Sequence, residues 1–323
     1  MTTQKSNAPK SAKTVAILMG GTSAEKEVSM ASGRACSDAL RQAGYNTRDI
    51  IVTDDLQKLM ADFKELPDVV FNALHGKGGE DGCIQGFLDL LGVPYTHSGR
   101  LSSAVCMNKK RSKNAVAPQG VPCAKDIILT GSEISPDNVP FDPPYVIKPN
   151  EEGSSVGIYI IKKHDNRLTE IFKNWDHGDM MVEEYISGRE LTVTVMDPAN
   201  SDDIRALTVT EICANGDGFY DYDAKYSKGG STHILPAPIP EDVFKACQKF
   251  AVLAHQGLNC RGVTRTDFRY DDSKPDTQGL YYLETNTQPG MTQTSLVPEQ
   301  AEFCGIDFKT LVSWMIENAR LYS

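Results

Sequence analysis

The chain has 323 residues, of which 40% are hydrophobic and 24% are charged, as in an ordinary soluble globular protein. This length exceeds what one hydrophobic core usually supports, so two or three packed units are expected. The net charge of -10 excludes a general nucleic-acid-binding surface, which needs a basic footprint. A local cationic cluster could still bind a small anionic ligand.

The eight cysteines are scattered and include no CxxC pair, which excludes the usual spacing of a zinc site. Reduced cysteines in the core of a cytoplasmic protein are therefore expected. No segment approaches the roughly 18 consecutive apolar residues of a membrane-spanning helix, so no membrane association is expected. Residues 1–13 carry lysines without an apolar segment behind them, which predicts a disordered tail and not a secretory signal.

Strands and helices alternate from residue 14 to residue 98. The apolar run TVAILMGG ends in Gly20 and Gly21, as a buried strand does when it enters a turn. Apolar residues at three- and four-residue spacing then predict a helix that ends near Gly44. Further elements are predicted as strands over 47–52, 68–76 and 93–97 and a helix over 83–92. Such alternation is typical of a parallel sheet that binds its ligand at the C-terminal strand ends.

The pattern changes near residue 100, where a basic helix ends at Pro118 and Gly120. Strands are then predicted over 124–129, 143–149, 155–161, 180–186, 189–196, 203–209, 262–270 and 279–286. Helices are predicted between the third and fourth of these strands and over 243–257 and 307–320. The chain is therefore divided into units of 14–98, 99–183 and 184–323, with soft boundaries.

A glycine- and serine-rich loop, NEEGSSVGI, follows the predicted strand that carries Lys148. Such a loop exposes backbone N–H groups and hydroxyls that can fold over phosphates. It isn't a Walker A sequence, and the first strand is not followed by GxGxxG. A plain flexible hairpin is the alternative, but Lys148 on the preceding strand favours a phosphate site.

The segment MVEEYI reads as a strand edge whose backbone could pair with a purine. A carboxylate such as Glu190 could then hold ribose hydroxyls, although an ordinary acidic strand explains these residues more simply. The segment ALHGKGGEDGCIQG places His75 in a glycine-rich loop just before a helix. Glycine-rich backbones and helix N-termini attract anions, which favours a functional role over a structural histidine.

Two predicted strands near the C-terminus carry oxygen ligands. Alternate side chains share a strand face, which groups Arg265 with Asp267 and Glu284 with Asn286. If the strands are neighbours, two carboxylates and an amide oxygen come together, a set that suits magnesium with substrate phosphates. A surface hairpin of mixed charge is the alternative. Gly290 and a run of hydroxyl side chains follow these strands.

Taken in order, these segments resemble the D-alanine–D-alanine ligase family of the ATP-grasp superfamily. The matching segments are GGTSAEKEVS, HGKGGEDGCIQG, MNKKRSK, VIKPNEEGSSVG, VEEYISGRELTV, FYDYDAKY, TRTDF and LETNTQPGMTQTSLVP. The resemblance implies an α/β ATP-grasp fold, in which an N-terminal parallel α/β domain precedes two α+β domains that clamp ATP between them. It also implies ATP-dependent ligation of two D-alanine molecules through an acyl phosphate, for peptidoglycan precursors, by a cytoplasmic homodimer.

The resemblance assigns one group of residues to the nucleotide and its metal. Those expected at ATP are Lys109 and Lys148 on the phosphates, Ser154 and Ser155 in the covering loop, Glu183, Glu184 and Ile186 at the adenine, Glu190 at the ribose and Lys225 in a second loop. Two Mg²⁺ ions, which Mn²⁺ can replace, are expected on Asp267, Glu284 and Asn286.

A second group is expected to bind and activate the two amino acids. These residues are Glu25 at the first ammonium, linked through Ser154 to Tyr226, His75 beside the first substrate, Arg265 and the Gly290 N–H at the oxyanion, and Ser295 and Leu296 at the carboxylate and methyl side of the second D-alanine. Glycine suits position 290 because a side chain would block the approach of the backbone to the reacting carbon.

Four positions depart from the commonest pattern of the family: Gln288 replaces a frequent serine, Thr294 a histidine, Asn108 an aspartate and Glu184 a lysine. These departures bear on substrate and nucleotide affinity more than on the reaction. Rival interpretations are a D-alanine–D-lactate ligase, another ATP-grasp carboxylate–amine ligase and a regulatory nucleotide-binding protein without catalysis. Tyr226 favours the dipeptide-forming type, and Arg265 with a complete metal-ligand set favours an enzyme.

Overall fold

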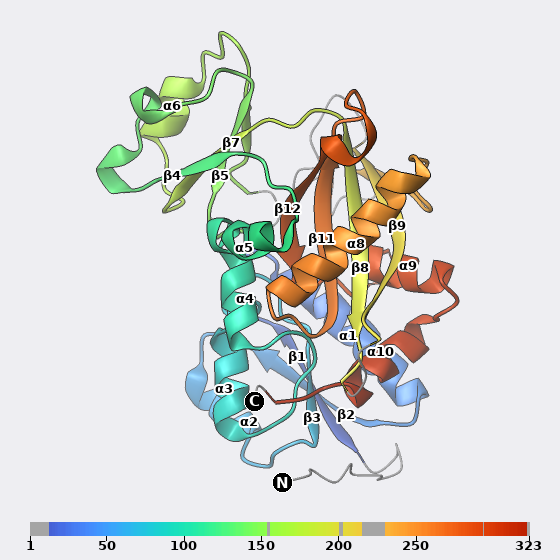
Figure 1. The fold of residues 1–323 in the computed structure, drawn as a ribbon. Helices are drawn as coiled ribbons and strands as arrows, with labels where there is room; N and C mark the ends of the chain where they lie inside the picture. The colour runs from blue at the N-terminus through green and yellow to red at the C-terminus, as the bar shows by residue number, and fades with distance from the viewer. Residues whose placement is uncertain (1–12, 154–155, 200–202, 215–229, 293, 322–323) are drawn as a thin grey trace.

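The computed structural model describes residues 13–153, 156–199, 203–214, 230–292 and 294–321 (Figure 1). Within these ranges the strands form three sheets, with the orders β2-β1-β3, β4-β7-β5-β6 and β10-β9-β8-β11-β12. The three sheets follow one another along the chain. The unit boundaries themselves stay a prediction.

The first sheet is parallel, as predicted, and has β1 at its centre. Its elements are β1 (Thr14–Gly20), α1 (Lys26–Gln42), β2 (Asn46–Val52), α2 (Leu56–Asp62), β3 (Val69–Asn72) and α3 (Cys83–Leu91). The strand predicted over 93–97 is wrong, because this segment makes only isolated bridges at Tyr95. Extended backbone ends at His97, whose φ of 69° is in the left-handed region, and Pro94 has no N–H to donate.

Two consecutive helices lead from the first sheet to the second. They are α4 (Arg100–Met107), which was not predicted, and α5 (Lys109–Val116), which is followed by η2 (Ala117–Gln119). The second sheet is antiparallel and includes β4 (Asp126–Leu129), β5 (Tyr145–Pro149), β6 (Tyr159–Ile161) and β7 (Met180–Glu184), with η3 (Gly131–Glu133), η4 (Pro136–Asn138) and α6 (Leu168–Lys173) in its connections.

The third sheet is also antiparallel and carries α8 against one face (Figure 1). Its elements are β8 (Arg189–Asp197), β9 (Arg205–Ala214), β10 (Ser231–Ile234), α8 (Glu241–Gly257), β11 (Gly262–Tyr270), η5 (Asp276–Gly279) and β12 (Leu280–Asn286). The chain then forms α9 (Leu296–Phe303) and α10 (Phe308–Glu317), of which only α10 was predicted.

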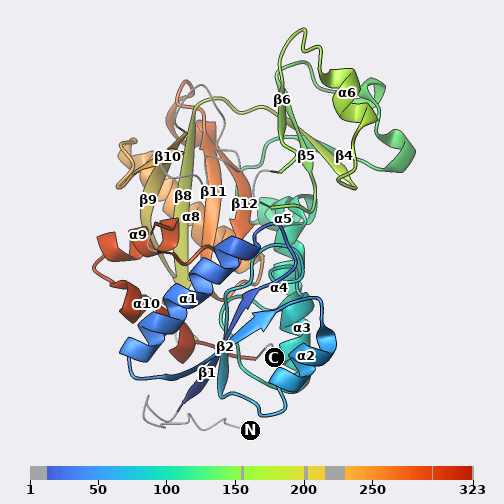
Figure 2. The same ribbon diagram turned by 180° about the vertical axis from the view of Figure 1, so that it is seen from behind.

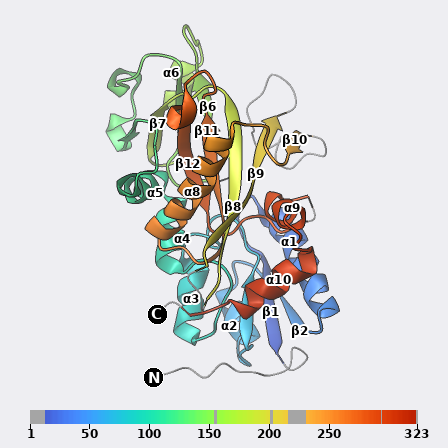
Figure 3. The ribbon, with the colours of Figure 1, turned by 45° about the vertical axis from the view of Figure 1, so that its right-hand side comes forward.

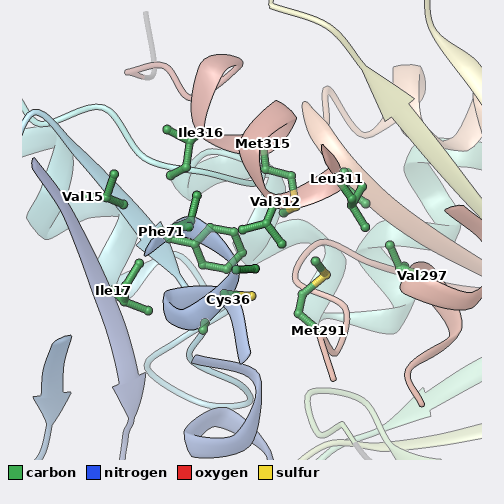
Figure 4. Close-up of a cluster of buried hydrophobic side chains, with 14 of the residues drawn as sticks. Val15, Ile17, Cys36, Phe71, Met291, Val297, Leu311, Val312, Met315 and Ile316 are labelled. Carbon is green, nitrogen blue, oxygen red and sulfur yellow. The ribbon is translucent and has the colours of Figure 1, made fainter. Parts of the chain in front are cut away.

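The largest hydrophobic cluster joins the two ends of the chain. Figure 4 shows Val15, Ile17 and Phe71 of the first sheet facing Leu311 and Ile316 of α10. Seen from behind, α1 lies beside α9 and α10 (Figure 2). The C-terminal helices therefore complete the core of the N-terminal sheet, and this packing fixes the third sheet relative to the first.

The cysteines are only partly as predicted. All eight are free, and four of them are buried: Cys36, Cys106, Cys247 and Cys260. The expectation of core cysteines is wrong for Cys83 and Cys304, which are exposed. Among the helices within the described ranges, none is long and apolar enough to cross a membrane.

Candidate active site

Two adjoining cavities contain every predicted site residue that lies within the described ranges. The large cavity has a volume of about 530 Å³ and the small cavity one of about 70 Å³. Lys109 and Glu284 line both of them, and the Lys109 Nζ lies 3.6 Å from Glu284 Oε2. A ligand in one cavity would therefore meet a ligand in the other at this pair.

The predicted metal ligands lie on paired strands, as the prediction required. In the β11–β12 pairing, Asp267 is opposite Glu284 and Arg265 is opposite Asn286. The Arg265 guanidinium holds both Asp267 carboxylate oxygens, at 3.0 and 2.9 Å. Thr192 Oγ1 also donates to Asp267 Oδ1 at 2.5 Å. These contacts fix the carboxylate in the buried sheet.

This donor set fits magnesium in ligand type. Within the described ranges, no group of three or more His, Cys, Asp and Glu side chains could hold a metal. Asp267 and Glu284 supply two carboxylates, so the amide oxygen of Asn286 and the oxygens of a substrate are needed to complete a site. Magnesium is bound in this way, by few carboxylates together with substrate phosphates.

The predicted phosphate lysine Lys148 belongs to a buried ion network. Its Nζ donates to Glu183 Oε2 at 2.6 Å, and Lys113 Nζ donates to Glu183 Oε1 at 2.6 Å. Lys113 Nζ also lies 2.7 Å from Asp126 Oδ1. Burial would raise the pKa of Glu183, but the two ammonium groups outweigh it and hold the pKa below its usual value. The sequence analysis did not identify Lys113 or Asp126.

The small cavity is lined by both apolar side chains and carboxylates. Its lining includes Ile186 and Leu283 together with Glu190, which lies 3.7 Å from the Arg269 guanidinium. Arg269 also donates to the carbonyl oxygens of Ile186 and Gly188, at 3.2 and 2.7 Å. The chain that follows β7 is thereby held in place, which suits a flat ring bound between apolar side chains.

At one end of the large cavity, Glu25 lies against two glycine-containing loops. A Cβ at Gly76 would come within 2.7 Å of Glu25 Oε2, and the φ of Gly76 is 69°, so glycine is required there. A Cβ at Gly153 would be 3.6 Å from the same oxygen. His75 is buried beside Ser32, its Nε2 3.3 Å from the hydroxyl. Burial lowers the pKa of His75 against the opposing effect of Glu25, which favours a neutral ring.

The sequence analysis missed Glu80 at this end of the cavity. The Gly76 N–H donates to Glu80 Oε1 at 2.6 Å. Burial, and then the nearby Glu25 carboxylate, raise the pKa of Glu80 to about 8. Its position in the segment HGKGGEDG, directly after a glycine-rich loop, was the available signal.

The loop that follows β12 and the start of α9 form another part of the wall of the large cavity. Ser295 Oγ accepts a hydrogen bond from the Thr292 N–H at 3.0 Å. A Cβ at Gly290 would approach this oxygen to 3.0 Å, so glycine leaves the space open. Leu296 and His233 also line the large cavity, and His233 was not predicted from the sequence.

Two of the four unusual positions, Gln288 and Asn108, have contacts that hold elements of the fold in place. The buried Gln288 accepts from Asn72 Nδ2 at 2.7 Å and donates to the Leu74 carbonyl, which ties the loop after β12 to the end of β3. Asn108 caps α5 by accepting from the Arg111 N–H at 2.9 Å. Four predicted residues, Ser154, Ser155, Lys225 and Tyr226, lie outside the described residues, so the link from Glu25 to Tyr226 stays a prediction.

Family models match the chain over two segments: "D-ala D-ala ligase N-terminus" over residues 55–98 and "D-ala D-ala ligase C-terminus" over residues 137–317. A D-alanine–D-alanine ligase of Cereibacter sphaeroides is 51% identical over 305 residues, which cover 94% of this chain and 95% of the relative. One from Acidiphilium cryptum is 52% identical over 308 residues, covering 95% and 98%.

Solved structures agree with these matches. The D-alanine–D-alanine ligase of Bacillus anthracis complexed with ATP aligns with a TM-score of 0.77 at 32% identity, over 95% of this chain and 96% of that chain. VanG D-Ala:D-Ser ligase from Enterococcus faecalis aligns with a TM-score of 0.78 at 28% identity, over 94% and 98%. The predicted ATP-grasp fold is thus confirmed. With about half its residues identical to these ligases over nearly its whole length, the chain belongs to the D-alanine–D-alanine ligase family.

Proposed function

We propose that this protein joins two D-alanine molecules into D-alanyl-D-alanine and converts ATP to ADP and phosphate, for the synthesis of peptidoglycan precursors. The observation that carries the proposal is the pair of cavities that meet at Lys109 and Glu284. The small cavity suits the base of a nucleotide, whose phosphates would extend to the junction with the large cavity. The large cavity suits two amino acids, so the γ-phosphoryl group would be transferred where the cavities join.

ATP would bind with its base in the small cavity and its phosphates toward the large one. Ile186 and Leu283 would pack on the adenine, Glu190 would accept hydrogen bonds from the ribose, and Lys148 and Lys109 would bind the phosphates. Magnesium bound by Asp267, Glu284 and Asn286 would neutralise phosphate charge. The protein's own part is mainly to position the groups and to balance their charge, which is what phosphoryl transfer requires.

The large cavity would bind the two amino acids in line. Glu25 would hold the ammonium of the first D-alanine, so that its carboxylate attacks the γ-phosphorus and forms an acyl phosphate. Arg265 and the Gly290 N–H would stabilise the oxyanion when the second amine attacks the acyl carbon. Ser295 would hold the carboxylate of the second D-alanine. Water must be excluded, because hydrolysis would destroy the acyl phosphate.

The second substrate, which accepts the acyl group, distinguishes the proposed function from its alternatives. A D-alanine–D-lactate ligase would share these residues, and one solved neighbour is named as a D-Ala:D-Ser ligase. Phosphate release from ATP and Mg²⁺ should be measured with D-alanine alone and with D-alanine plus D-lactate, D-serine or L-alanine, and the products identified by mass. We expect the D-alanine dipeptide to predominate near neutral pH. Equal amounts of depsipeptide would overturn the assignment.

Cytoplasmic location and a homodimer are also part of the proposal. The supply of ATP and the eight free thiols are consistent with the cytoplasm. Exposed apolar side chains on α2, α3 and α4 support a second copy as partner. Leu90 is 90% exposed and Leu101 is 55% exposed, on either side of an ion pair between Asp89 and Arg100.

A further inference from the structure

The proposed ligation includes a proton transfer to which no residue has yet been assigned. At neutral pH the second D-alanine carries an ammonium group, and its nitrogen has no lone pair until a proton leaves. Glu25 is placed at the first D-alanine, while Arg265 and the Gly290 N–H are hydrogen-bond donors. A base is needed at the end of the large cavity where the second D-alanine binds.

His233 lies at that end. It belongs to β10, and its Nδ1 is 2.6 Å from Glu299 Oε2 on α9. The Glu299 N–H donates to the Ser295 carbonyl at 3.1 Å, so Glu299 is one helical turn from the residue proposed to hold the acceptor carboxylate. Figure 3 shows β10 next to α9, and both His233 and Ser295 line the large cavity. The His233 side chain is 16% exposed, which leaves the ring accessible to a bound substrate.

The carboxylate of Glu299 orients the imidazole for this task. When Nδ1 donates its proton to Glu299, Nε2 carries the lone pair and can accept a proton. The Nε2 atom lies 3.4 Å from Ser231 Oγ on the same strand. An imidazole whose far nitrogen is held by a carboxylate is a common arrangement for a general base.

The other imidazole in the cavity is less suited to this role. His75 is buried beside Ser32, and its electrostatic neighbours are Glu25 and Arg265, which places it with the first substrate. Glu299 on α9 contacts His233, Glu27 on α1 and Arg265 on β11 line the same cavity, and Glu211 is on β9, the strand paired with β10. Of these, only Glu299 makes an ion pair with His233 within the described ranges.

We propose that His233 is the general base for the acceptor and that Glu299 is its positioning residue; this inference rests on the proposed function. Nε2 takes one proton from the ammonium of the second D-alanine, and the freed lone pair forms the C–N bond with the acyl carbon. The bond from that carbon to the phosphate oxygen then breaks with its electron pair. The second proton of the amine leaves with the phosphate as hydrogen phosphate, and His233 later releases its proton to solvent.

The test separates the two halves of the reaction. In His233→Asn the amide nitrogen can keep the contact with Glu299, while the Nε2 base is lost. Hydroxylamine is uncharged at neutral pH, needs no base and traps the acyl phosphate as a hydroxamate. We expect His233→Asn to reduce dipeptide formation at neutral pH by roughly 10²-fold and to leave the rate of hydroxamate formation close to wild type. The loss should shrink as the pH rises and the acceptor deprotonates by itself.

The paired variants are Glu299→Gln and Glu302→Gln, one turn apart on α9, of which only the first contacts His233. Glu299→Gln should reduce dipeptide formation without reducing hydroxamate formation, and the exposed Glu302→Gln should change neither. Equal loss of both products in His233→Asn would assign His233 a structural role and overturn the inference, as would full dipeptide formation. If the wild type forms hydroxamate but no dipeptide, the proposed function fails instead.

Discussion

Individual carboxylates in this site differ because their surroundings differ. Glu183 is buried between two lysine ammonium groups, which hold its pKa low although burial opposes ionisation. Glu80 is placed near the Glu25 carboxylate, so burial and repulsion both raise its pKa. The same side chain thus serves as an anchored anion in one place and as a readily protonated group in another.

The metal assignment predicts a large effect from one substitution. Glu284→Gln removes a charge from the wall between the cavities while it keeps the size of the side chain. We expect ligase activity to fall more than tenfold, because the metal would lose one of its two carboxylate ligands. Such a loss corresponds to more than about 1.4 kcal/mol of barrier. The melting temperature should stay close to wild type. Steady-state rates and thermal unfolding check both points, and a variant with more than about a tenth of wild-type activity would contradict the assignment.

Glu80 predicts a pH-dependent stability. Its pKa in the folded protein is about 8, above the ordinary 4.5, so the folded state keeps a proton that the unfolded chain loses within this window. Folding stability contributed by Glu80 therefore falls as the pH rises from about 4.5 to 8. In Glu80→Gln this penalty is absent, while the amide oxygen can still accept from the Gly76 N–H.

Urea unfolding of wild type and Glu80→Gln should be compared at about pH 5 and about pH 8. The variant should gain stability relative to wild type between these conditions, by a few kcal/mol at most. Glu302→Gln, at an exposed position, is the control and should show little difference. A constant difference between wild type and Glu80→Gln at both pH values would show that Glu80 ionises alike in both states.

At the scale of elements, the ion network connects α5 to three strands of the second sheet, β4, β5 and β7. Lys113 on α5 contacts Asp126 on β4 and Glu183 on β7, and Glu183 contacts Lys148 on β5. Removal of Lys113 leaves two buried carboxylates with one cation fewer. A buried ion pair that loses one partner typically costs about 3–5 kcal/mol of stability.

Lys113→Met should therefore lower the free energy of unfolding by about that amount. It should also raise the KM for ATP more than the KM for D-alanine, because Glu183, the partner of Lys148, loses one of the two ammonium groups that fix it. The control is Lys125→Met, whose side chain is 81% exposed and pairs with Glu184 at 3.4 Å. An exposed pair contributes only about 0–1 kcal/mol. Similar losses in both variants would show that the buried network contributes no more than a surface pair.

The elements that the sequence predicted differ physically from those that it missed. Strand β1 is an apolar run that ends at Gly20, and β8 has apolar side chains at alternate positions, so both carry a strand signal. The buried residues of α4 are Ser102, Ser103 and Cys106, so no apolar stripe in the sequence indicates a helix there. Helix α9 contains Pro298 in its first turn, where proline is tolerated but resembles a turn signal.

At the scale of the whole molecule, the site could be predicted only in part. Polar residues at alternate positions of a predicted strand, such as Asp267 after Arg265 and Glu284 before Asn286, are visible in the sequence. Contacts between distant segments are not, as His233 and Glu299 show, because neither stands in a recognisable pattern. Lys113 is one of several basic residues in α5, so the sequence does not distinguish it from its neighbours, and only the fold places it against Glu183.

The exposed apolar surface of α2, α3 and α4 predicts a dimer. Phe63, at the end of α2, packs edge-on against Phe87 of α3 with ring centroids 5.4 Å apart, so these helices are neighbours. Their outer residues include Leu56, Leu90 and Leu101, which are 70%, 90% and 55% exposed. Apolar side chains gathered on one face of a protein commonly mark a contact with another chain.

A double variant, Leu90→Lys and Leu101→Lys, would place two like charges in this face and prevent two copies from burying it. Sedimentation velocity should show a dimer for wild type and a monomer for the variant, at the same protein concentration. Phe303→Lys on α9 is the control, because Phe303 is also 53% exposed but belongs to a different surface. A stable interface must bury at least about 1,000 Å², so two like charges within it should abolish it and not merely weaken it. If the double variant sediments as a dimer, or wild type as a monomer, the second copy does not bind through these helices.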